Sequence, residues 1–245
     1  MSNLIRIEGT SQIVHLVLNR PKNVNALNEA LLAQLKDALD EAVSADARAI
    51  ILRGAGRGFS GGADLSELTG TVEDLIVDER IATVTQTILD APMPIMAALH
   101  GYCFGGAVDV AWACDMVIAT PKTRIAVPAT RLGILYNPRP LRRLYARLGS
   151  LALRRLFLFG DELTGEAAWR MGAVAHLAHD GDVVTLADAL AAKVIAGQPA
   201  AIDATKQFLN ELDAGGVDIE GWQARRTMLQ DSAERLEIVK ARQKR

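Results

Sequence analysis

Two glycine-rich segments contain the residues whose types and spacing suit chemistry. They are Gly56-Arg-Gly-Phe-Ser-Gly-Gly-Ala-Asp-Leu65 and His100-Gly-Tyr-Cys-Phe-Gly-Gly-Ala-Val-Asp-Val110. Each follows an apolar run, and small residues let backbone N–H groups approach a ligand closely. The second segment also opens a predicted helix, whose first N–H groups lack intrahelical partners. Two such donors aimed at one point form an oxyanion hole; the alternative is that each segment is only a tight turn.

Composition and motifs exclude several other classes of protein. The 245 residues are 50% apolar and 4% aromatic with a net charge of -2, which argues against disorder and gives no basic surplus for nucleic acid. No phosphate-binding or dinucleotide-binding glycine motif occurs. The two cysteines, Cys103 and Cys114, have no zinc-binding spacing and are expected to pack in the core of a cytoplasmic protein. Asp109 and Asp115 interrupt the longest apolar stretch, which argues against a membrane span.

The apolar periodicity predicts an α/β fold with a mostly parallel sheet. Strands are expected at 4–8, 13–18, 49–52, 94–99 and 115–119, and helices after Asn28 and over 72–89. From residue 138 onward the pattern is almost wholly helical and ends in one predicted helix over 217–244. We therefore expect a core over residues 1–190 and a helical C-terminal region over 191–245.

Four motifs in this order resemble the crotonase superfamily, also called the enoyl-CoA hydratase/isomerase family. They are Asn19-Arg-Pro-Lys-Asn-Val-Asn-Ala-Leu-Asn28, Phe59-Ser-Gly-Gly-Ala-Asp-Leu65, the segment 94–101 with Gly105-Gly106 and Cys114-Asp115, and the segment 163–174. The resemblance implies a ClpP/crotonase-like spiral of ββα units and a helical C-terminal region that drives assembly into a homotrimer or a dimer of trimers. It also implies an acyl-CoA substrate, with no metal and no cofactor besides the coenzyme A of the substrate.

The same resemblance assigns roles to individual residues. The backbone N–H groups of Ala63 and Gly106 would hold the thioester oxygen and stabilise an enolate. The residues expected to contact coenzyme A are Lys22, Ala26, Gly61, Asp64 and Leu65. Two of these have other interpretations, because Lys22 can be an ordinary loop lysine and Asp64 can fix its loop by hydrogen bonding.

The sequence departs from the family at the two glutamates of its hydratases. Asp109 occupies the first position, one helical turn after Gly106, as a shorter proton-transfer group or as a polar residue bonded to nearby amides. Ala129 aligns with the second position after Val127-Pro128, and its methyl group cannot transfer a proton. Ordinary hydratase activity is therefore doubtful, and a non-catalytic acyl-CoA binding protein is one alternative.

A further alternative comes from Gly133-Ile-Leu-Tyr-Asn137, which is similar to the methylmalonyl-CoA decarboxylase branch. There Tyr136 would contact the carboxylate of a malonyl-type substrate. A run of arginines follows, at Arg139, Arg142, Arg143 and Arg147. Such a run is typical of a solvated helix face, and the alternatives are contacts with a neighbouring subunit or with the phosphates of coenzyme A.

Overall fold

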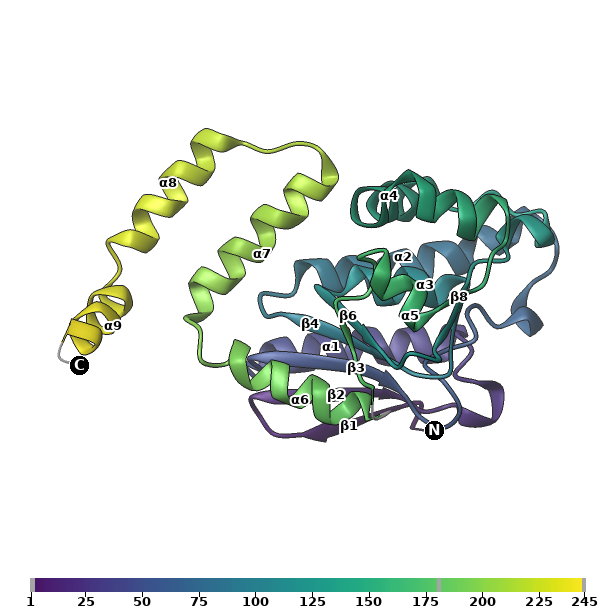
Figure 1. Ribbon diagram of the computed structural model, residues 1–245, viewed down its shortest axis with the longest axis horizontal. Coiled ribbons are helices and arrows are strands. Elements are labelled where there is room, and N and C mark those ends of the chain that lie inside the picture. Colours follow the sequence, from purple (N-terminus) through teal and green to yellow (C-terminus); the bar gives the residue numbers. More distant parts are fainter. Residues whose placement is uncertain (1–2, 180–181, 244–245) are drawn as a thin grey trace.

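A six-stranded, largely parallel sheet forms the centre of the molecule (Figure 1). The computed structural model describes residues 3–179 and 182–243. In spatial order the strands are β1 (Ile5–Gly9), β2 (Ile13–Leu18), β3 (Ala49–Gly54), β4 (Ile95–Leu99), β6 (Met116–Ala119) and β9 (His176–Leu177). β1 pairs antiparallel with β2, and every other neighbouring pair is parallel. The predicted α/β class and parallel sheet are confirmed.

The central strands are buried on both faces, which explains their continuous apolar runs. On β3, Ile50 and Leu52 join a core shared with α1 (Glu29–Ser44), α2 (Leu75–Asp90) and α3 (Gly106–Ala113). Ile51 points to the other face, where it packs with Ala187 of α6 (Val183–Val194). Figure 1 shows α6 on the opposite side of the sheet from α2 and α3. The predicted division at residue 190 falls within α6 and stays a prediction.

A second, three-stranded sheet contains part of the second glycine segment. It consists of β5 (Tyr102–Phe104), β7 (Arg124–Ala126) and β8 (Leu163–Thr164). The second glycine segment is therefore more than a tight turn, because its residues 102–104 pair in parallel with 124–126. Gly101 makes the turn from β4 to β5 with φ +58°, and a Cβ there would overlap the carbonyl oxygen of Arg57.

The remaining helices extend from the core toward the C-terminus. They are α4 (Pro138–Leu153), α5 (Gly165–Arg170), α7 (Pro199–Ala214), α8 (Ile219–Gln230) and α9 (Ala233–Gln243). In Figure 1, α8 and α9 lie away from the sheet beyond α7. The single helix expected over 217–244 is interrupted at Asp231 and Ser232, where the Ser232 hydroxyl accepts a hydrogen bond from the amide of Arg235.

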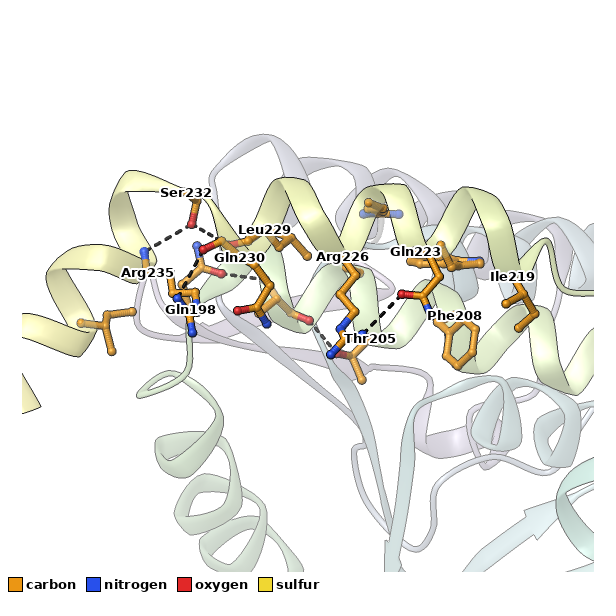
Figure 2. Close-up of a pocket in the computed structure, with 15 residues that line it drawn as sticks. Gln198, Thr205, Phe208, Ile219, Gln223, Arg226, Leu229, Gln230, Ser232 and Arg235 are labelled. Carbon is orange, nitrogen blue, oxygen red and sulfur yellow. Dashed lines mark hydrogen bonds between the residues drawn. The ribbon is translucent and has the colours of Figure 1, made fainter.

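A cavity of about 510 Å³ lies between α7, α8 and α9 (Figure 2). Its apolar lining includes Phe208 and Trp222, whose rings pack edge to face with centroids 5.3 Å apart. All of its lining residues lie between positions 198 and 238, so it is separate from the two glycine segments in sequence and in the fold.

The lengths and apolar content of the helices bear on whether any of them could span a membrane. Within residues 3–179 and 182–243, no single helix is both long and apolar enough to cross a bilayer. Helices α6 and α7 together meet the length and composition requirements, but they meet at an angle of 111°.

Candidate active site

The two glycine segments run side by side in register. Ser60 and Cys103 form a parallel bridge, in which the Ser60 amide donates to the Tyr102 carbonyl at 3.0 Å and the Phe104 amide donates to the Ser60 carbonyl at 3.1 Å. Ala63 follows Ser60 by the same number of residues as Gly106 follows Cys103. By this register Ala63 and Gly106 occupy equivalent positions of the two segments, and their role as a pair of donors stays a prediction.

Glycine at position 62 permits this close approach. Gly62 has φ +91°, and a Cβ built on it would lie 2.5 Å from the Phe104 carbonyl oxygen. On the other strand, the Gly105 amide donates to the Ala126 carbonyl at 2.9 Å, and Gly106 then begins α3. Any side chain at position 62 would push the two backbones apart.

The amides of Ala63 and Gly106 have no acceptor among the residues that the structure describes. Gly106 is the first residue of α3, so its N–H has no intrahelical partner and lies at the positive end of the helix dipole. Two free amides at neighbouring positions are what an oxyanion hole requires.

The segment 19–28 is tied to the first glycine segment by a buried asparagine. Asn25 is fully buried, and its amide group donates to the carbonyls of Ala55, Gly58 and Phe59 at 2.9, 3.0 and 3.1 Å. Its side-chain oxygen accepts from the Arg20 amide at 2.8 Å. Losing these bonds would leave several buried polar groups unpaired, so this residue holds both loops in place.

The residues expected to bind coenzyme A lie along the same pair of segments. The Gly61 amide donates to the Val24 carbonyl at 2.8 Å, and Leu27 bridges Ala63. The five expected residues therefore lie on two neighbouring segments, 19–28 and 56–65. Lys22, Gly61 and Leu65 are exposed, and Ala26 and Asp64 are half-buried. This arrangement leaves the five residues accessible to solvent, beside the segments that contain the free amides of Ala63 and Gly106.

Asp64 uses its carboxylate within this loop. It accepts from the Ser66 hydroxyl at 2.7 Å and pairs with Arg20 at 2.8 Å. The hydrogen bonds from Ser66, followed by that from Arg20, lower the pKa of Asp64 below its ordinary value. These contacts support a role in fixing the loop.

Asp109 lies in the first turn of α3, just beyond the Gly106 amide. Its side chain is almost completely buried, with only 2% of the residue exposed, and it forms an ion pair with Arg143 of α4. Burial raises the pKa of Asp109 to about 6, because the charged form loses its hydration, and the Arg143 charge offsets part of that rise. A carboxyl group with this pKa can accept and return a proton near neutral pH.

Arg143 and Arg147 point into the protein, so the expectation of a solvated face is wrong for these two residues. Arg147 donates to the carbonyls of Trp112 and Cys114 at 2.7 and 2.6 Å, at the C-terminal end of α3. It also pairs with Asp213 of α7 at 2.8 Å. Arginine suits this place because the last carbonyls of a helix lack intrahelical donors.

Tyr136 packs against the core in a partly buried position. Its ring packs edge to face on Phe157, with centroids 4.9 Å apart. Burial raises the pKa of Tyr136 well above its ordinary value, and the negative charges of Asp109 and Asp78 raise it further. The charge of Asp109 thus acts on Tyr136.

Asp78 of α2 is a member of this cluster that the sequence analysis missed. It lies one turn before Ile81, whose side chain occupies the space beside the Gly106 Cα. Burial raises the pKa of Asp78, and its charge in turn raises the pKa of Asp109. The available signal was an acidic residue next to the apolar positions 77, 81, 84 and 88 of a buried helix face.

Ala129 contributes no proton-transfer group. It is 7% exposed and lies in the short helical turn that follows Pro128. The charged and polar side chains of this site therefore come from α2, α3, α4 and the segment before α4.

The two cysteines are packed in the core, as expected. Cys103 and Cys114 are both buried, and burial raises the pKa of both thiols, that of Cys114 to about 12. Among the described residues, no group of three or more His, Cys, Asp or Glu side chains is arranged to hold a metal ion.

A family model described as "Enoyl-CoA hydratase/isomerase" matches residues 8–244. The chain belongs to this family. It is 29% identical over 240 residues to "Probable enoyl-CoA hydratase echA6" of Mycobacterium bovis, covering 97% of this chain and 94% of that one. It is 32% identical over 212 residues to "Probable enoyl-CoA hydratase" of Bacillus subtilis, covering 84% and 82%.

Solved structures agree with this family assignment. The crystal structure of an enoyl-CoA hydratase/carnithine racemase from Magnetospirillum magneticum aligns with a TM-score of 0.91 at 27% identity, covering 100% of this chain and 94% of that one. The predicted crotonase fold is confirmed. Membership of this family supports a role with CoA thioesters, with acyl-CoA as the substrate class.

The charges around Asp109 predict pKa shifts of opposite sign. Arg143→Met removes a positive charge, so the pKa of Asp109 rises above about 6; Asp78→Asn removes a negative charge, so it falls. The measurement is a pH titration followed by carbon-13 NMR of aspartate-labelled protein, assigned with Asp109→Asn. Arg143→Lys keeps the charge and serves as the control. Equal midpoints in Arg143→Met and the native chain would contradict the electrostatic account.

Proposed function

We propose that the protein catalyses proton transfer at the carbon next to the thioester of an acyl-CoA. One observation carries the proposal: the buried carboxyl of Asp109, with a pKa of about 6, lies one helical turn beyond the free amide of Gly106. Coenzyme A would lie along Lys22, Ala26, Gly61, Asp64 and Leu65. The reaction needs no bound cofactor besides the coenzyme A of the substrate.

The steps follow from the positions of these groups. The thioester oxygen accepts hydrogen bonds from the Ala63 and Gly106 amides. Asp109 removes a proton from the adjacent carbon; the C–H electron pair forms a C=C bond, and the negative charge moves to the oxygen. The protonated Asp109 then returns the proton to the same carbon, or to a more distant carbon of the enolate when a double bond is conjugated with it. One donor of such a hole typically lowers the activation barrier by about 3–4 kcal/mol.

The surroundings of Tyr136 do not favour decarboxylation of a malonyl-type substrate. The negative charges of Asp109 and Asp78 both act on its hydroxyl, and Arg143 already pairs with Asp109. A substrate carboxylate placed there would meet two like charges and one shared counter-charge. Decarboxylation and non-catalytic binding stay alternatives that the following test separates.

The test is exchange of the proton next to the thioester with deuterated water. Butyryl- and hexanoyl-CoA are expected to take up deuterium, detected by mass spectrometry, and Asp109→Asn should slow this by about 10²–10⁴-fold. Asp37→Asn, an exposed aspartate of α1, is the matched control. Carbon dioxide release from methylmalonyl-CoA that depends on Tyr136 would favour the decarboxylase instead. Tight binding of thioesters without exchange or turnover would favour the binding protein.

Hydration of crotonyl-CoA is expected to be slow because Ala129 replaces the second carboxylate. The expected rate is about 100-fold or more below that of a two-glutamate hydratase of the family assayed alongside. Ala129→Glu should raise the rate, whereas Ala129→Gln, which has the same size and no acidic proton, should not. An ordinary hydratase rate in the native chain would overturn this inference.

We also propose that α7–α9 drive assembly into a homotrimer or a dimer of trimers. These helices expose large apolar side chains, among them Leu209, Leu212, Ile219, Met228 and Leu236 at 49–74%. Light scattering coupled to gel filtration should give the mass of three or six chains. A monomer at micromolar concentration would contradict the proposal.

A further inference from the structure

A second cavity, of about 220 Å³, is lined by Arg143, the ion-pair partner of Asp109. It is enclosed by Gln86 and Leu89 of α2, by Arg139, Arg142 and Arg143 of α4, and by the C-terminal end of α7. Three arginines therefore line a space of limited size between three helices. None of them belongs to the family motifs of the sequence.

The positive charge of this cavity is not balanced by the protein. Asp213, the carboxylate in its wall, is already paired with Arg147 at 2.8 Å. Arg142 donates to the carbonyl oxygen of Ala214, which carries no charge, and the Arg139 guanidinium has no partner within the described part of the chain. Arg139 and Arg142 are exposed and have no carboxylate partner among the described residues, and their forked donors suit an anionic carboxylate ligand.

Arg143 connects this cavity to the active site. Its side chain is only 13% exposed; one terminal nitrogen pairs with Asp109, while its buried Nε has no partner among the described residues. α2 gives the scale: Ile81 lies beside Gly106, and Gln86 and Leu89 lie about 8–12 Å further along the helix axis. The distance from the free amides of Ala63 and Gly106 to the cavity is therefore about the length of one acyl chain.

We propose that this cavity binds a carboxylate at the far end of the acyl group, so that the substrate is the CoA thioester of a dicarboxylic acid. The inference rests on the proposed function, which places the thioester at Ala63 and Gly106. Coenzyme A then leaves on the side of Lys22 and Leu65, and the acyl chain leaves past Asp109 toward Arg143. Arg139 and Arg142 hold the terminal carboxylate, and Arg143 lies between this cavity and the negative charge of Asp109.

The experiment compares matched thioesters that differ only in the terminal carboxylate. Glutaryl-, adipyl- and suberyl-CoA are paired with pentanoyl-, hexanoyl- and octanoyl-CoA, and the dissociation constant of each is measured by calorimetry. At the best chain length the dicarboxylic member should bind about tenfold tighter or more. Arg139→Gln and Arg142→Gln should each reduce this ratio by about tenfold. Arg154→Gln, an exposed arginine outside the cavity, should leave it unchanged.

The possible results separate this inference from the proposed function. Equal binding of the two thioesters in every pair overturns the carboxylate site, and so does an unchanged ratio of their dissociation constants in Arg139→Gln. Arg139 suits this test because its removal breaks no side-chain contact within the described part of the chain. Equal weakening of both members of a pair by Arg139→Gln overturns it too, since the cavity would then bind the phosphates of coenzyme A. A preference for dicarboxylic thioesters without deuterium exchange in any thioester overturns the proposed function and leaves the carboxylate site standing.

Discussion

The site depends on one backbone contact, the approach of Gly62 to the carbonyl of Phe104. Because glycine at position 62 carries no Cβ, the two loops can approach closely and lie in register, with Ala63 and Gly106 at equivalent positions. Asn25 and the pairing of β5 with β7 hold the two loops from either side. The helix that starts at Gly106 then carries Asp109 to the site. A shift of this contact would move both amides and the carboxyl together.

The second feature of the site is a set of charges that are buried at a cost and balanced only in part. Asp109 loses hydration, gains the attraction of Arg143 and is repelled by Asp78. The result is a carboxyl that titrates near neutrality, where an exposed aspartate would always be ionised. The same helix, α4, supplies Arg143 to the carboxyl and Arg139 and Arg142 to the cavity that Arg143 also lines. One helix thus connects acid–base chemistry with a candidate site for the acyl end.

Much of the fold was predictable because strands buried on both faces leave a strong apolar signal. β2, β3 and β4 were expected within a few residues of their bounds. The short β5 was not, since Tyr102–Phe104 is a run of only three residues between glycines, too short to show a strand pattern, and it forms a strand by pairing with β7. The break between α8 and α9 was missed because the helical pattern of the sequence is continuous there. The break is marked by one hydrogen bond, in which the Ser232 hydroxyl accepts from the Arg235 amide and caps α9.

The sequence by itself determined the family, the two loops, the carboxyl at Asp109 and the missing carboxyl at Ala129, because each lies in or beside a local motif. Only the tertiary structure brought Asp78 and Arg143 to Asp109. These residues lie on α2 and α4, about 30 positions before and after it, and no motif connects them. The inward direction of the Arg143 side chain and the partial burial of Asp78 depend on how three helices pack. The residue spacing within one helix does not encode that packing.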